Sequence, residues 1–214
     1  IVRRLVGSEM CIRDRVRAHP HIWIDMNTKL IFNNNGHIQA LEIFWLFDPF
    51  YSAFLSIRVE QIRKKGKKNA YSEFASGMAE RLAKHHYFTE ATVNGKRIQF
   101  FQHRNTASGK ISRGKNKGRF WSKLTLDLSQ PIDPKKNQFS YSVYDPTYYI
   151  EILHVEKQPA FELVGLKNNN CIGRLIKANP DEEIRTFAAS LDKTQSGGKE
   201  LGRLFADRVV LQCK

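Results

Sequence analysis

Two histidines and an aspartate near the start of the chain have the types and spacing of metal ligands. Residues 18–26 read AHPHIWIDM. In an extended strand alternate side chains share a face, so His19, His21 and Asp25 would lie on one side and apolar residues on the other. Imidazole and carboxylate groups suit nickel, cobalt, zinc or copper. We therefore expect His19 and His21 to bind a divalent transition metal with help from Asp25. The alternative is a strand whose histidines make structural hydrogen bonds.

Three further side chains are weaker candidates for the same metal site. Asp48 precedes Pro49, and this pair favours a helix N-cap over a metal ligand. Asp145 precedes Pro146, so a turn is its first interpretation, although the tyrosines around it could also place it in a pocket. His86 lies where a helix is expected to end, and there it could serve as an additional ligand.

The first residues of the chain do not resemble a native N-terminus. Residues 1–15 read IVRRLVGSEMCIRDR, which lacks the apolar core of a signal peptide and resembles the translation of a sequencing adapter. We therefore expect 1–17 to be a non-native leader and 18–214 to form a single domain. Ala18 resembles the end of a signal-peptide cleavage site, which would make His19 the first mature residue.

Composition indicates a globular, strongly basic protein. The formal net charge is +14 and 41% of the residues are hydrophobic, and no apolar run approaches the ~18 residues of a membrane span. Basic residues concentrate at 63–68, which read RKKGKK, and at 110–119. Neither stretch forms a recognised nucleic-acid motif, so we expect no nucleic-acid partner. We interpret both stretches as solvated loops; contact with an anionic membrane surface is the alternative.

The hydrophobic pattern predicts mostly strands with helices inserted. Asp48 and Pro49 begin a predicted helical insertion at about 49–85, and Asn179 is the expected N-cap of a short helix at about 180–191. Hairpin turns between strands imply antiparallel pairing. The expected fold is α+β, mainly antiparallel and sandwich-like. The predicted strands are 22–32, 38–47, 87–93, 96–103, 119–128, the segment around 139–143, 148–155, 171–177 and 204–212.

Cysteine usage bears on the compartment. Cys11 falls in the expected leader, which leaves Cys171 and Cys213. An even count in an exported chain favours a disulfide, worth roughly 4 kcal/mol on the chain-entropy model. Two reduced buried thiols, or a metal site without the close pairing of zinc modules, are the alternatives.

Enzyme signatures are absent from the sequence. The chain contains no GxSxG, HExxH or P-loop motif and no GxGxxG in context. We therefore predict that the protein is not an enzyme. A hydrolase whose Ser, His and Asp assemble only in space remains a third hypothesis.

Five ordered motifs resemble those of a known bacterial family. They are HPHIWID at 19–25, FWLFDPFYSAF at 44–54, HYFT at 86–89, YSVYDPTYYIE at 141–151 and FADRVVLQC at 205–213. Together they resemble a family of unknown function described as the periplasmic component of an uncharacterised ABC-type transport system, whose genes tend to accompany nickel/cobalt-type permeases. The family positions that match here are His19, His21, Asp48, Asp145, Cys171 and Cys213.

The resemblance implies a periplasmic accessory protein that binds a divalent metal or delivers it to an inner-membrane permease. Some relatives carry an acidic, calcium-loop-like segment in the helical insertion, but here residues 63–73 read RKKGKKNAYSE, which argues against calcium. The alternative is a metal-free interaction module whose basic loops dock a permease or an anionic membrane. The sequence carries no signal for the oligomeric state.

Overall fold

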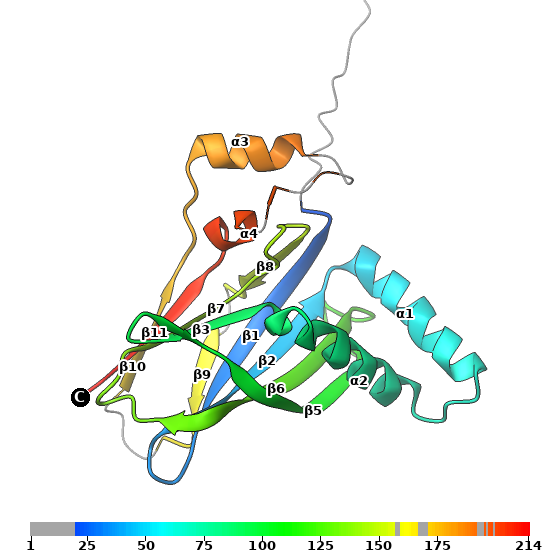
Figure 1. The fold of residues 1–214 in the computed structure, drawn as a ribbon. Helices are drawn as coiled ribbons and strands as arrows, with labels where there is room; N and C mark the ends of the chain where they lie inside the picture. The colour runs from blue at the N-terminus through cyan, green and yellow to red at the C-terminus, as the bar shows by residue number, and fades with distance from the viewer. Residues whose placement is uncertain (1–19, 157–158, 167–170, 192–194, 196, 199) are drawn as a thin grey trace, which may run out of the picture.

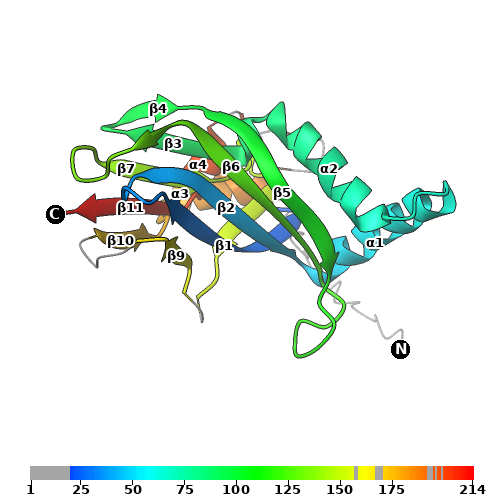
Figure 2. The same ribbon diagram turned by 90° about the horizontal axis from the view of Figure 1, so that it is seen from below.

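Two β-sheets form the body of the protein, and helices flank them (Figure 1). The computed structural model describes residues 20–156, 159–166, 171–191, 195, 197–198 and 200–214. Seen from below, the long strands of the first sheet curve over the second (Figure 2). The predicted α+β, sandwich-like architecture is confirmed, whereas the expected leader and His19 lie outside the described residues.

The first sheet is built around the N-terminal strand. Its order is β5-β6-β2-β1-β8, and β9 also pairs with β1. β1 is antiparallel to β2 but parallel to β8 and β9. No turn motif marks these parallel pairs, because they join segments far apart in the chain. The bounds are β1 (Ile22–Phe32), β2 (Ile38–Phe47), β5 (Phe100–Lys110), β6 (Phe120–Ile132), β8 (Ile150–His154) and β9 (Phe161–Val164).

The second sheet is antiparallel in every pair. Its order is β10-β11-β7-β3-β4. Asn94 and Gly95, both with positive φ, close the predicted hairpin between β3 and β4. The bounds are β3 (Thr89–Val93), β4 (Lys96–Ile98), β7 (Phe139–Val143), β10 (Cys171–Ile176) and β11 (Arg208–Cys213).

The predicted helical insertion is present as two helices. α1 (Pro49–Lys64) begins after the Asp48 cap, and the basic turn that follows it leads into α2 (Ala70–Ala83). A short 3-10 turn, η1 (His86–Phe88), then leads into the second sheet.

The C-terminal region departs from the prediction in two places. α3 (Glu182–Ser190) is capped by Asp181 and not by Asn179, because the Asp181 carboxylate accepts the Ile184 N–H at 2.8 Å. The side chain of Asn179 instead accepts a hydrogen bond from Arg185 at 3.1 Å. A short helix, α4 (Leu201–Leu204), precedes β11, so the last strand begins later than predicted.

The core lies where the inner faces of the sheets and the insertion meet. Met26 and Leu30 on β1 are fully buried and share one cluster with Phe139 on β7 and Phe74 on α2. Each such side chain contributes about 1.5–3 kcal/mol on burial. The alternation predicted for β1 is confirmed, since Ile22, Ile24 and Met26 point inward. Within the described ranges, no helix is long and apolar enough to cross a membrane.

Candidate functional site

The predicted metal-ligand face of β1 points outward. His21 precedes the strand, where its backbone N–H donates to the Tyr149 carbonyl at 2.9 Å and its ring lies 4.7 Å from the Tyr149 ring. The Trp23 side chain is 49% exposed and the Asp25 side chain 51% exposed. Trp23 and Asp25 therefore share one exposed face of β1, whereas the His21 ring is half-buried against Tyr149 with its Nε2 atom buried, and His19 lies outside the described residues.

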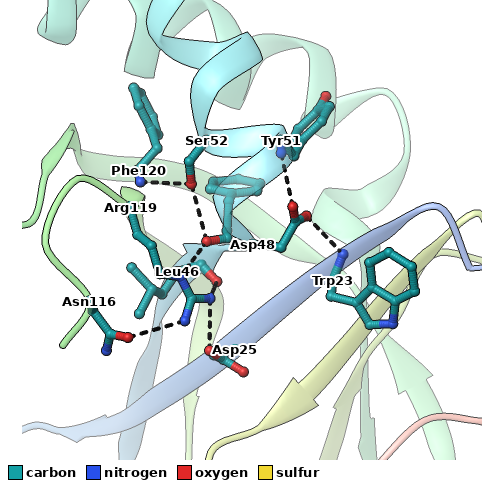
Figure 3. Close-up of polar contacts among 10 residues, drawn as sticks. Trp23, Asp25, Leu46, Asp48, Tyr51, Ser52, Asn116, Arg119 and Phe120 are labelled. Carbon is teal, nitrogen blue, oxygen red and sulfur yellow. Dashed lines mark hydrogen bonds and ion pairs between the residues drawn. The ribbon is translucent and has the colours of Figure 1, made fainter.

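Asp25 is paired with an arginine that is itself held in place. An Arg119 N–H donates to the Asp25 carboxylate at 2.8 Å. The same guanidinium donates to the carbonyls of Phe47 at 2.7 Å and Leu46 at 3.1 Å (Figure 3). These two backbone acceptors hold the guanidinium beside Asp25, so a metal at Asp25 would compete with this ion pair.

Asp48 is an N-cap, as the sequence favoured. One carboxylate oxygen accepts the Tyr51 N–H at 2.9 Å and the other accepts the Trp23 N–H at 3.2 Å. The Asp48 N–H in turn donates to the Trp23 carbonyl at 2.9 Å. Figure 3 shows this carboxylate between the start of α1 and β1. Asp48 therefore fixes the angle at which the helix leaves the sheet.

Asp145 organises the turn between β7 and β8. It is 5% exposed, and its carboxylate accepts hydrogen bonds from the Thr147 N–H, the Thr147 hydroxyl and the Ile150 N–H at 2.9–3.0 Å. Gly202 packs against it so closely that an added Cβ would lie 1.8 Å from the Asp145 carbonyl oxygen. This is the turn role that the Asp-Pro pair predicts.

His86 lies in a left-handed segment. His86, Tyr87 and Phe88 all have φ between 51° and 56°, which costs roughly 1–2 kcal/mol for each non-glycine residue. The Tyr87 hydroxyl contacts His103 Nδ1 at 3.0 Å, and the Tyr144 N–H donates to the Phe88 carbonyl at 2.7 Å. These contacts hold the turn, while the His86 side chain is exposed.

The five candidate ligands that the structure describes do not form one site. Within those ranges, no group of three or more His, Cys, Asp or Glu side chains could hold a metal ion. His21 is half-buried against Tyr149 and Asp25 is ion-paired with Arg119, whereas Asp48, Asp145 and His86 serve separate turns and caps. A contribution from His19 lies beyond what the structure describes.

The predicted disulfide is present. Cys171 on β10 and Cys213 on β11 are register partners, and their sulfur atoms are bonded. The bridge fixes the end of the chain to an edge strand of the second sheet. A disulfide is consistent with an oxidising compartment.

A buried polar network joins the two sheets, and sequence reasoning missed it. Thr28 Oγ1 lies 2.5 Å from the Tyr141 hydroxyl and 3.4 Å from His154 Nε2. His154 Nδ1 lies 3.5 Å from an Asp207 carboxylate oxygen, which also accepts from Lys177 at 3.1 Å. Asp207 stands in the FADRVVLQC motif, but only the fold brings it to His154.

Burial and hydrogen bonds shift the pKa values of the side chains in this network. Burial raises the pKa of Asp207, but hydrogen bonds from His154, Lys177 and the Ala178 N–H outweigh it, so the pKa lies below its usual value. Burial also raises the pKa of Tyr141, which keeps its hydroxyl protonated. Thr28, Tyr141, His154 and Asp207 are each 1–2% exposed. These four groups are therefore shielded from solvent, whereas the Lys177 side chain that contacts Asp207 is 47% exposed.

The helical insertion carries the most exposed apolar surface near the N-terminal strand. Phe50, Phe54 and Ile57 are 85%, 43% and 58% exposed, and their spacing places them on one face of α1. The Trp23 backbone lies beside the start of this helix, where it exchanges two hydrogen bonds with Asp48 (Figure 3). The basic stretch 63–68 follows the same helix.

A groove of about 490 Å³ lies between α1, α2 and the ends of β1, β2 and β8. Most of its lining is apolar, including Ile24, Trp45 and Met78. Its charged lining residues, within the described part of the chain, are the cations Arg58, Lys65 and Arg81.

Comparison with known proteins identifies the family of this chain. A family model described as "Protein of unknown function (DUF1007)" matches residues 7–213. The chain belongs to the DUF1007 family. An uncharacterised protein of Haemophilus influenzae is 32% identical over 206 residues, which cover 93% of each chain. No solved structure matches this DUF1007 chain.

Proposed function

We propose that this DUF1007 protein is a periplasmic accessory protein of transition-metal transport that docks on the inner membrane beside a permease. The observation that carries the docking is the exposed apolar face of α1 followed directly by a basic turn. The periplasmic location is supported by the disulfide and by the resemblance to a transport-associated family.

The chemistry of the insertion suits an anionic phospholipid surface. Phe50 and Ile57 would enter the boundary between headgroups and acyl chains, where interfacial helices place their apolar residues. The cations of 63–68 lie at the end of the same helix, and each contributes about 1 kcal/mol near an anionic bilayer. Apolar anchoring and charge attraction together supply the two signals that stable peripheral binding needs.

We propose that the metal binds at the start of the N-terminal strand. The resemblance, and the place of His21 and Asp25 at the start of the first sheet, support a transient site completed by His19 for nickel, cobalt, zinc or copper. Two imidazoles and an ion-paired carboxylate form a sparse ligand set, which suits delivery to a permease better than storage. A docking module that carries no metal is the alternative proposal.

The docking proposal is tested by co-sedimentation with vesicles that contain phosphatidylglycerol or only phosphatidylcholine. We expect binding to the anionic vesicles that weakens with added salt, because salt screens exposed charges. Phe50→Asp together with Ile57→Asp should reduce the affinity at least tenfold. Ile172→Asp with Ile176→Asp is the matched control, because those apolar residues on β10 are also more than half exposed, at 58% and 51%. Equal loss in both pairs would contradict docking through α1.

The metal proposal is tested with protein processed so that His19 is the N-terminus. Metal content and calorimetric titration with Ni²⁺, Co²⁺, Zn²⁺ and Cu²⁺ should show near-stoichiometric binding, which is lost in His19→Ala/His21→Ala and kept in the control His37→Ala. Absence of uptake at micromolar metal, together with intact vesicle binding, would favour the metal-free docking module.

A further inference from the structure

The groove between α1 and α2 combines an apolar interior with cations that have no acidic partner in the described part of the chain. Ile24 and Trp45 from the first sheet, Leu55 from α1, and Phe74 and Met78 from α2 supply apolar lining. A volume of about 490 Å³ lies within the range of small-molecule sites. The groove is therefore large enough for one extended apolar chain.

Three cations line this groove without acidic partners. Arg58, Lys65 and Arg81 form no ion pair with any residue that the structure describes. Arg58 lies 5.0 Å from the centre of the Phe54 ring and donates to Gln61 at 3.3 Å. The charges of Arg58 and Arg81 both act on the Tyr51 hydroxyl, although burial has the larger effect and raises the pKa of Tyr51. Arg58 on α1 and Arg81 on α2 therefore both line the groove that Tyr51 also lines.

A buried donor in the groove lacks an acceptor. The Trp45 side chain lines the groove and is 2% exposed, and its Nε1–H has no hydrogen-bond partner among the described residues. An unmet buried donor is costly, so most such groups in folded proteins have a partner. A ligand that entered deeply enough to place an oxygen acceptor at this buried atom, next to an apolar chain, would satisfy it.

We infer that this groove binds one anionic single-chain amphiphile, with its acyl chain between α1 and α2 and its headgroup on Arg58 and Arg81. A monoacyl phospholipid fits all three observations, because its phosphate would pair with the arginines and its ester oxygen lies between the headgroup and the chain. The inference rests on the proposed membrane docking only for the source of the lipid, since binding can be measured without a membrane.

The experiment is calorimetric titration of the intact protein with lauroyl lysophosphatidylglycerol below its micelle concentration. Laurate tests an anionic head without an ester, and lauroyl lysophosphatidylcholine tests a zwitterionic head. We expect saturable one-to-one binding of the phosphatidylglycerol form, at least tenfold tighter than the phosphatidylcholine form, because charge-assisted hydrogen bonds would be lost. No saturable binding, or equal affinity for both heads, would overturn the inference.

Variants assign the binding to the groove. Arg58→Gln with Arg81→Gln should remove the headgroup preference, whereas Arg174→Gln with Arg208→Gln, exposed on the second sheet, should keep it. Met78→Trp should block binding by filling the groove. Trp45→Phe removes the donor and keeps most of the ring, so it should weaken the lysophospholipid several-fold and laurate less. Unchanged affinity in Met78→Trp, with its unfolding transition intact, would overturn the inference.

Failure of the two proposals can be told apart. Phe50→Asp/Ile57→Asp changes residues outside the groove lining, so it should lose vesicle binding and keep lysophospholipid binding. Met78→Trp should keep vesicle binding and lose lysophospholipid binding. Lysophospholipid binding without vesicle binding would support the groove and contradict docking, whereas vesicle binding without lysophospholipid binding would overturn the groove alone.

Discussion

Between the two sheets, polar side chains are buried in mutual contact, whereas on α1 apolar side chains stand in solvent. Thr28, His154 and Asp207 are 1–2% exposed and lie within reach of one another. Phe50 and Ile57 are 85% and 58% exposed. Buried polar groups with partners specify a fold, while an exposed apolar face marks a surface for binding. The comparison therefore separates what holds this protein together from what it offers to a ligand.

The largest effect is expected from removing the carboxylate at the centre of the buried network. Asp207→Ala leaves the Lys177 ammonium, the Ala178 N–H and the His154 N–H without their acceptor, so the free energy of unfolding should fall by about 3 kcal/mol. Urea denaturation measures this change. Glu60→Ala breaks an exposed ion pair with Arg63 and should cost under about 1 kcal/mol. Similar losses of unfolding free energy in Asp207→Ala and Glu60→Ala would show that the buried network stabilises the fold no more than an exposed ion pair.

The next largest effect on stability is expected at the buried hydrogen bond between Thr28 and Tyr141. Thr28→Val leaves the buried Tyr141 hydroxyl without its 2.5 Å partner, and Tyr141→Phe leaves Thr28 only the longer contact with His154 at 3.4 Å, so each should cost roughly 1–3 kcal/mol. The double variant should cost less than the sum of the two, because both partners are then gone. Additive losses in urea denaturation would mean that the hydroxyl groups stabilise the fold independently.

The features that could be predicted from the sequence are those that depend on neighbouring residues in the chain. The alternation of β1, the Asp48 cap and the 49–85 insertion were predictable because each depends on neighbours in the chain. The parallel pairing of β1 with β8 was not, since it joins distant segments without a turn signal. His154 and Asp207 were missed for the same reason, because they meet only in the folded protein.

The candidate functional residues also separate into those whose roles depend on chain neighbours and those whose roles depend on the whole fold. Asp48 and Asp145 have the local cap and turn roles that their Asp-Pro pairs predict. The groove was invisible in the sequence, because its apolar residues read as ordinary core and its cations as ordinary surface. Its composition emerges only when α1 and α2 are placed beside the first sheet.

A smaller effect is expected from acidification. The pKa of Asp207 is lowered in the folded protein, so its stabilising contribution is present above about pH 4, the unfolded value, and is lost as the pH falls through the folded value. The free energy of unfolding should therefore decrease more steeply below pH 4 in the wild-type protein than in Asp207→Asn. Exposed Glu60→Gln should keep the wild-type slope. Parallel pH profiles for the wild type and Asp207→Asn would contradict the assignment.

The smallest effect on stability is expected on α1, where the proposed docking effect is largest. Phe50→Asp/Ile57→Asp replaces side chains that already face solvent, so the free energy of unfolding should change by no more than about 0.5 kcal/mol per site. Leu55→Ala, buried on the same helix at 5% exposure, should cost about 2 kcal/mol or more. A large loss of stability in the double Asp variant would mean that this face is covered in solution. Exposure would then no longer distinguish α1 from the core, and sedimentation equilibrium of both variants would show whether a second copy provides the cover.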